Sequence, residues 1–153
     1  LSLHDALPIY ALAGSLAHSG ILSVGRKIRG DFSSHRMGHS ISFMYGTPHG
    51  ATLSIILIAW ARYLYEENPV PFAKLGEEVF DIFDGSDEDK ALEAIDALED
   101  FFKDINTPTT LREIGVKEED IEKLAANASR GESFGKLSKL EPEDVLEIFK
   151  LAY

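Results

Sequence analysis

Apolar residues recur at every third or fourth position along most of this chain, which is the spacing of one face of an α-helix. No segment shows the strict alternation of a half-buried strand, and no repeat of fixed period is present. Helices are predicted over residues 10–24, 31–45, 51–65, 71–83, 86–105, 117–128 and 142–152. The pattern therefore predicts an all-α domain, a helical bundle.

Turn-forming and capping residues mark the ends of several of these helices. The stretch Gly25–Gly30 is expected to end the first helix, and Asp31, Ser33 or Ser34 is expected to cap the second. The segment Gly46-Thr-Pro-His-Gly50 has the composition of a turn and leads into the third helix.

The predicted helix over residues 86–105 begins with Ser86 and three acidic residues, where the helix dipole favours negative charge. Its predicted apolar face consists of Ala91, Leu92, Ile95, Leu98, Phe101, Phe102 and Ile105. Pro142 suits the first turn of the last helix.

The segment Leu53–Trp60 is almost entirely apolar and could be mistaken for a membrane span. A spanning helix needs about 20 such residues, and here Arg62 and Glu66 close a shorter run. The segment is therefore predicted to be a helix buried inside the protein, and no membrane is expected as a partner.

Charge and cysteine content exclude several classes of function. The chain of 153 residues carries a formal net charge of -11, and its first 50 residues contain only two acids, Asp5 and Asp31. An acidic surface repels phosphate backbones, so nucleic-acid binding is not expected. The chain has no cysteine, which excludes disulfides and thiolate metal sites and fits a reducing cytoplasm.

Three of the five histidines lie close together in the sequence, at His35, His39 and His49. His35 and His39 are one helical turn apart and would share a helix face, and a neutral imidazole is a common metal ligand. His49 lies in a Pro-His-Gly turn that would aim one side chain. Ordinary surface or core histidines would also fit this spacing, and His4 and His18 have no partners at a useful distance in the sequence.

Longer motifs surround these histidines. The runs Asp31-Phe-Ser-Ser-His-Arg-Met-Gly-His39 and Met44-Tyr-Gly-Thr-Pro-His-Gly50 resemble the histidine signature of iron-containing (group III) alcohol dehydrogenases. Ile58-Ala-Trp-Ala-Arg-Tyr63 is similar to the sequence that follows it in the butanol dehydrogenase branch. Thr109–Gly115 and Glu143–Ile148 resemble C-terminal segments of the same branch.

The resemblance implies a domain organisation. Residues 11–153 would form the helical, metal-binding C-terminal domain of a dehydroquinate-synthase-like fold, and the N-terminal α/β nucleotide-binding domain would be missing. Residues 1–10 resemble a translated sequencing adapter and are expected to be a non-native leader. Gly25–Gly30 has no preceding strand and is a weak phosphate-binding candidate, so no cofactor-binding residue is assigned.

The resemblance also implies roles for the histidines. Family members bind a divalent metal, usually iron, through one aspartate and three histidines, and the last two histidine ligands correspond to His35 and His49. His39 corresponds to a residue near the nicotinamide that takes part in proton transfer. Asp31 aligns as a helix cap rather than as the metal aspartate, and Gly38 stands where many members have glutamate.

The implied function is the interconversion of alcohols and aldehydes or ketones by hydride transfer with NAD or NADP. The expected cofactors are Fe²⁺, or Zn²⁺ or another divalent ion, and the nicotinamide. The expected partners are a small alcohol or aldehyde, the missing domain and a second copy in a cytoplasmic homodimer. The chain alone is expected to be inactive.

Two other classes of function are compatible with parts of the pattern. A helical histidine–aspartate phosphohydrolase needs an adjacent His-Asp pair, which occurs only at His4-Asp5. A non-enzymatic helical module that binds a partner through an amphipathic face fits the composition. It leaves the histidine spacing unexplained.

Overall fold

The structure is a computed structural model that describes residues 3–25 and 30–153. The chain divides into two compact units, residues 1–31 and residues 32–153. Among the described residues, the regular elements are α-helices and 3₁₀ turns. One isolated antiparallel bridge pairs Phe134 with Leu140. The predicted all-α fold is therefore confirmed.

The first unit contains helix α1 (Leu3–His18) and the 3₁₀ turn η1 (Ile21–Ser23). The predicted helix over residues 10–24 thus starts earlier and ends earlier than expected. Gly20 has a left-handed backbone with φ of 75°, which stops the helix before Ile21. Most apolar side chains of this unit are exposed, including those of Tyr10 and Leu12.

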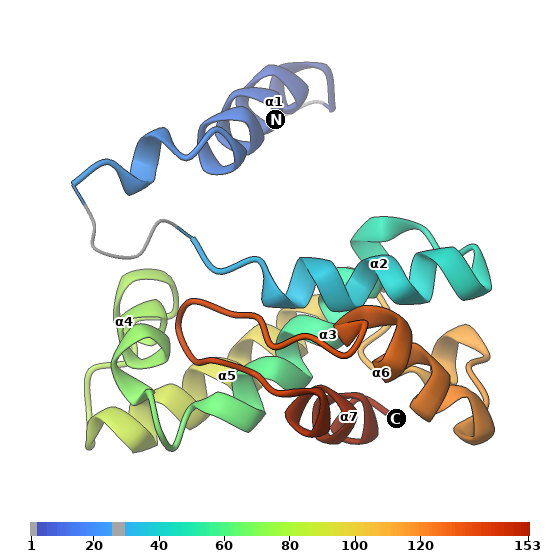
Figure 1. Cartoon of the computed structure of the whole chain (residues 1–153). Helices are drawn as coiled ribbons and strands as arrows, with labels where there is room; N and C mark the ends of the chain where they lie inside the picture. Colours follow the sequence, from blue (N-terminus) through green and yellow to red (C-terminus); the bar gives the residue numbers. More distant parts are fainter. Residues whose placement is uncertain (1–2, 26–29) are drawn as a thin grey trace. The chain divides into compact units, whose positions relative to one another are not determined.

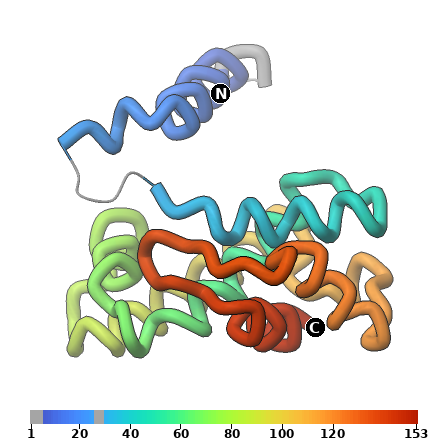
Figure 2. Tube along the Cα trace, in the orientation of Figure 1, coloured from blue at the N-terminus to red at the C-terminus, as the bar shows by residue number. Residues whose placement is uncertain are grey.

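The second unit contains the remaining helices (Figures 1 and 2). Their bounds are α2 (Ser33–Tyr45), α3 (His49–Leu64), α4 (Pro69–Val79), α5 (Asp87–Asp104), α6 (Ile121–Ser129) and α7 (Pro142–Leu151), with 3₁₀ turns η2 (Arg112–Ile114) and η3 (Glu118–Asp120). Helix α3 packs against α2, α5 and α7, while α6 packs against α2 and α7. Helix α4 packs against α5.

Helix α3 supplies much of the hydrophobic core, as its apolar sequence predicts. Ile55 and Ile56 are fully buried, and Trp60 packs edge-on against Phe72 of α4. The core continues through fully buried side chains of the other helices: Met37, Ile41, Ile95, Leu124, Val145, Ile148 and Phe149. No helix within residues 3–25 and 30–153 combines the length and apolar character needed to cross a bilayer.

Capping explains where some helices begin. Ser86 forms a reciprocal capping box with Asp89 at the start of α5, and Pro142 occupies the first turn of α7. The predicted N-cap of α2 is wrong, because the N-cap residue is Phe32, whose side chain makes no capping hydrogen bond. Ser33 and Ser34 lie inside α2 and are buried.

Polar side chains also fasten the helices of the second unit to one another. Tyr63 of α3 donates a hydrogen bond of 2.7 Å to Asp144 of α7. Arg62 of α3 donates to Asp96 and Glu99 of α5, at 2.6 and 2.7 Å. These contacts fix α3 against its neighbours and hence the position of its first residue, His49.

Candidate metal centre

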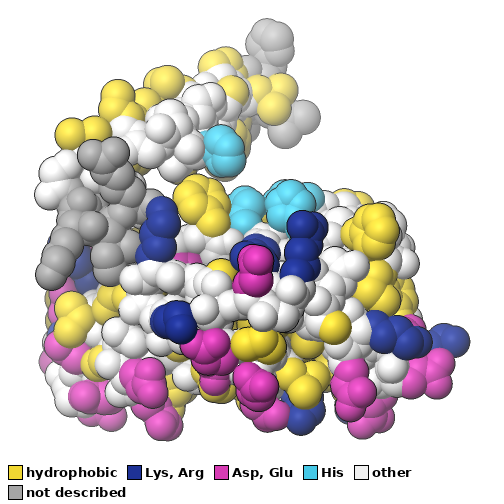
Figure 3. Space-filling view, in the orientation of Figure 1, with side chains coloured by type: hydrophobic (Ala, Val, Ile, Leu, Met, Phe, Trp, Pro, Cys, Tyr) yellow, Lys and Arg dark blue, Asp and Glu magenta, His cyan; other side chains and the backbone are white. Residues whose placement is uncertain are grey.

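The three clustered histidines come from two helices that meet at a tight turn. His35 and His39 are one turn apart on α2, and His49 is the first residue of α3. Gly46 ends α2 in a left-handed conformation with φ of 67°, which favours glycine and reverses the chain. In Figure 3, histidine side chains reach the surface over α2, whereas acidic side chains mostly gather toward the opposite edge of this unit.

The three imidazole rings lie close together, as the spacing predicts. The ring centroid of His49 lies 5.0 Å from that of His35 and 4.7 Å from that of His39. The centroids of His35 and His39 are 6.4 Å apart. His35 and His49 are half-buried, while His39 is exposed.

These distances test which rings could hold one metal ion. An imidazole nitrogen lies about 2.0–2.1 Å from a bound zinc ion, so two rings that bind one ion at about 90–110° have centroids about 4.6–5.3 Å apart. Both pairs that include His49 fall in this range, and the pair of His35 and His39 exceeds it. The centroid distances are therefore compatible with an ion shared by His49 and His35, or by His49 and His39, but not by all three rings at such angles.

The environment of His49 favours its neutral form. Burial, and next the charge of His39, lower the pKa of His49 below its ordinary value. A metal-binding imidazole must be neutral, so this environment is compatible with coordination. The ring of Phe32 packs edge-on against His35, with 5.4 Å between their centroids, and covers part of that ring.

The opposite side of α2 is held in place by contacts that sequence reasoning missed. Arg36 donates hydrogen bonds of 2.8 Å to the carbonyls of Ala128 and Ser129 at the end of α6. Its guanidinium also lies 4.3 Å from the ring centroid of Phe134. Ser40 donates a hydrogen bond of 2.8 Å to the Leu124 carbonyl. No local sequence pattern signals these hydrogen bonds, because their partners lie 84 to 93 residues further along the chain.

The remaining sequence candidates are His4, His18, Asp31 and the Gly25–Gly30 stretch. Within residues 3–25 and 30–153, no group of three or more His, Asp or Glu side chains has the arrangement of a metal site. Asp31 and His18 belong to the first unit, which is described separately. The side chain of His4 and most of the Gly25–Gly30 stretch lie outside the described residues.

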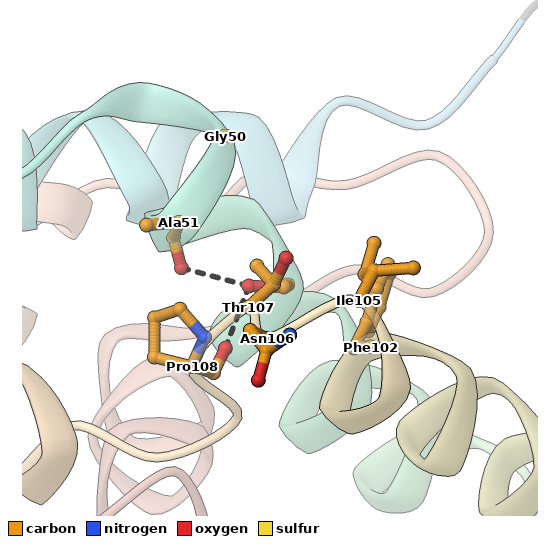
Figure 4. A pocket seen from close by; sticks show the side chains of 8 residues that line it. Gly50, Ala51, Phe102, Ile105, Asn106, Thr107 and Pro108 are labelled. Atoms are coloured by element: carbon orange, nitrogen blue, oxygen red, sulfur yellow. Dashed lines mark hydrogen bonds between the residues drawn. The ribbon is translucent and has the colours of Figure 1, made fainter.

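A pocket of about 430 Å³ opens beside the start of α3 (Figure 4). Its wall consists of Gly50, Ala51, Ser54, Phe102, Ile105, Asn106, Thr107 and Pro108. The Ser54 hydroxyl lies 2.6 Å from the carbonyl oxygen of Pro108 and 3.0 Å from that of Ala51, and its one hydrogen can be donated to either. The contact with Pro108 joins the loop after α5 to α3. This pocket could not be predicted from local sequence patterns, because its two walls are far apart along the chain.

Comparison with known proteins adds an independent line of evidence. The family model for "Fe-containing alcohol dehydrogenase family, C-terminal" matches residues 11–153. Probable NADH-dependent butanol dehydrogenase 1 of Bacillus subtilis is 35% identical over 139 residues, which is 90% of this chain and 35% of that protein. NADH-dependent butanol dehydrogenase A of Clostridium acetobutylicum is 35% identical over 145 residues, which is 92% of this chain and 37% of that protein.

A solved structure agrees with these sequence similarities. The crystal structure of NADH-dependent butanol dehydrogenase A from Thermotoga maritima superposes with a TM-score of 0.85 at 36% identity. The match covers 93% of this chain and 37% of that one. The chain thus spans little more than a third of the length of these relatives.

Proposed function

Because the chain belongs to the Fe-containing alcohol dehydrogenase family, as its C-terminal domain, we propose that it supplies two metal ligands and a proton-transfer residue to such an enzyme. The complete protein would interconvert alcohols and aldehydes or ketones by hydride transfer with NAD(P)(H). The names of its relatives favour NADH as the nicotinamide and a primary alcohol such as butanol as the substrate.

The observation that carries this proposal is the approach of His49 to His35, with ring centroids 5.0 Å apart across two helices. This distance between two half-buried rings is compatible with one shared divalent ion, and burial lowers the pKa of His49, which favours the neutral ring that a metal needs. Geometry alone also allows His39 as the partner of His49. The family motif and the greater exposure of His39 favour His35 as the ligand.

When bound, the metal would act as a Lewis acid toward the alcohol or carbonyl oxygen. His39 would act as the proton relay, which its exposed ring beside the ring of His49 supports. Half-buried His35 and His49 would orient the ion, with α2 held by Arg36 and Ser40.

The remaining components of the enzyme are proposed from the family. Iron is the expected metal, although imidazole ligands also accept zinc, nickel or cobalt. Residues 11–153 would form the metal-binding domain, residues 1–10 a non-native leader, and a separate α/β domain would bind the nicotinamide. The enzyme would be a cytoplasmic homodimer.

Metal content tests the proposal in the complete enzyme. The variants His35→Ala and His49→Ala are expected to lose the metal and the dehydrogenase activity together. The variant His39→Ala is the matched comparison, and it should retain stoichiometric metal while kcat falls by roughly 10²–10⁴-fold. Full metal content in the first two variants would contradict the ligand assignment. Replacement of all three histidines without loss of function would favour a non-enzymatic module.

A further inference from the structure

Thr52 lies one turn after His49 on α3 and is fully buried. Its hydroxyl donates a hydrogen bond of 2.8 Å to the His49 carbonyl oxygen. The same oxygen, Oγ1, lies 3.5 Å from Nδ1 of the His49 ring, at the long end of the hydrogen-bond range. The side chain of Thr52 therefore contacts both the backbone and the ring of the proposed metal ligand.

The hydrogen count at Thr52 favours one tautomer of the His49 ring. A threonine hydroxyl has one hydrogen, and the short contact of 2.8 Å directs it to the carbonyl of His49. With that bond formed, Oγ1 can only accept from the ring, so a hydrogen bond across the longer contact requires the proton on Nδ1. In a neutral imidazole this leaves Nε2 without a hydrogen and with a lone pair available.

We propose that Thr52 is a positioning residue for His49, which it holds in the Nδ1–H tautomer so that Nε2 is the ligand atom. The ligand role of Nε2 rests on the proposed function, in which His49 binds the metal. The tautomer itself does not depend on a bound metal. Partners that hold the second nitrogen of a ligand histidine typically change metal affinity by about 10–100-fold when they are removed.

Gly38 provides the space that this arrangement needs. A Cβ atom at Gly38 would lie 2.9 Å from Oγ1 of Thr52 and 3.4 Å from Cδ2 of Leu53. Any side chain at position 38 would therefore push against the hydroxyl that contacts His49. Gly38 lies on α2 between His35 and His39, so the same close approach sets the distance between the two helices that carry the histidines.

The tautomer can be measured directly in the metal-free 153-residue chain. Two-bond ¹H–¹⁵N correlation spectra of ¹⁵N-labelled protein distinguish Nδ1–H from Nε2–H imidazoles. We expect Nδ1–H for His49 in the unsubstituted chain and in Thr52→Ser, which keeps the hydroxyl. Thr52→Val keeps the volume but removes the hydroxyl, and should shift the ring toward Nε2–H. An Nε2–H ring in the unsubstituted chain, or no change in Thr52→Val, would overturn the proposal.

A pair of glycine substitutions tests the role of the space at position 38. Gly38→Ala should disturb the His49 ring signals, because the new methyl group meets Oγ1 of Thr52. Gly50→Ala is the matched control next to His49, since a Cβ there meets no atom within 4 Å. Equal changes in the two variants would contradict the proposed contact.

A cobalt titration of the complete enzyme separates this inference from the proposed function. Thr52→Val should weaken Co²⁺ binding by roughly 10-fold or more, and Thr52→Ser should restore it. Unchanged Co²⁺ affinity in Thr52→Val would overturn the link between Thr52 and the ligand atom. A different result would separate the two claims. If the unsubstituted enzyme does not bind Co²⁺ although His49 has the Nδ1–H tautomer, the proposed metal site is wrong and the tautomer assignment stands.

Discussion

The imidazole rings of His35 and His49 lie with their centroids 5.0 Å apart, although one ring belongs to α2 and the other to α3. The turn at Gly46 brings the two helices together, and the glycine at position 38 lets them approach closely. The pair is half-buried, and burial holds the pKa of His49 below its ordinary value. Metal binding would therefore meet two rings that already lie close together, and burial favours the neutral form of His49.

Arg36 anchors α2 on α6, and its loss should loosen the helix that carries His35 and His39. The variant Arg36→Leu removes two hydrogen bonds from a charged donor to the carbonyls of Ala128 and Ser129. Such bonds are each worth about 1.5–3 kcal/mol, so the variant should lose about 2–4 kcal/mol of unfolding free energy, with some compensation from water. Urea denaturation measures this loss.

Arg36→Lys provides the control for charge. It keeps the positive charge but cannot donate two hydrogen bonds in the geometry of a guanidinium. We expect it to recover only part of the stability. Full recovery would show that charge, rather than the two-pronged contact with α6, holds α2 in place.

Tyr63 should give the chain a distinctive response to alkaline pH. Its hydrogen bond to Asp144, together with burial, raises the pKa of Tyr63 to about 12. An unfolded tyrosine has a pKa of about 10, so between about pH 10 and pH 12 the folded state retains a proton that the unfolded state loses. The contribution of Tyr63 to stability is therefore present below pH 10 and declines as the pH rises toward 12.

Spectrophotometric titration of tyrosinate checks this prediction. The unsubstituted chain should show one late step near pH 12 that is absent from Tyr63→Phe. In addition, Tyr63→Phe should lose about 1–3 kcal/mol of unfolding free energy at neutral pH, because the contact between α3 and α7 is removed. A titration curve that is the same in both proteins would contradict the assigned pKa.

Part of the fold could be predicted from the sequence because it depends on local patterns. The helices α3, α5 and α7 follow from apolar spacing, and Ser86 and Pro142 mark where two of them begin. The cap of α2 was predicted wrongly, because Ser33 and Ser34 are buried inside the helix instead of facing its end. The burial of a serine by distant parts of the chain leaves no local signal.

The predicted apolar face of α5 was correct in part, since Leu98 and Phe102 pack against the core whereas Leu92 is exposed. Ala91 and Ile95 are fully buried, whereas Phe101 and Ile105 are 48% and 52% exposed. Ile105 lines the pocket beside α3 instead of the core. Helical spacing identifies which side chains share a face, but it cannot show where the neighbouring helix ends.

In the candidate site, too, some features could be predicted from nearby residues in the sequence, whereas others depend on distant parts of the chain. The sequence brought His35, His39 and His49 together through their spacing and their family motif, and the structure places their rings side by side. The roles proposed for each ring stay predictions. Contacts of Arg36 and Thr52 could not be foreseen, because they depend on how α2 meets α6 and α3.

The 153-residue chain by itself should show no alcohol-dependent reduction of NAD or NADP. It carries two of the proposed ligands, and its sequence contains no strand followed by a glycine-rich phosphate turn. The absorbance of NADH or NADPH, followed with purified chain, an alcohol and Fe²⁺ or Zn²⁺, measures this. Turnover that survives in His49→Ala would indicate a contaminant. Turnover that His49→Ala abolishes would refute the prediction.

The proposed binding of one metal ion by His35 and His49 is tested most directly by anomalous diffraction from crystals of the complete enzyme. The data are collected at the absorption edge of the bound metal. We expect a single anomalous peak per subunit within bonding distance of His35 and of Nε2 of His49, with the ring of His39 beside it but not bonded. A peak bonded to His39 in place of His35, or a metal site that includes neither helix, would contradict it.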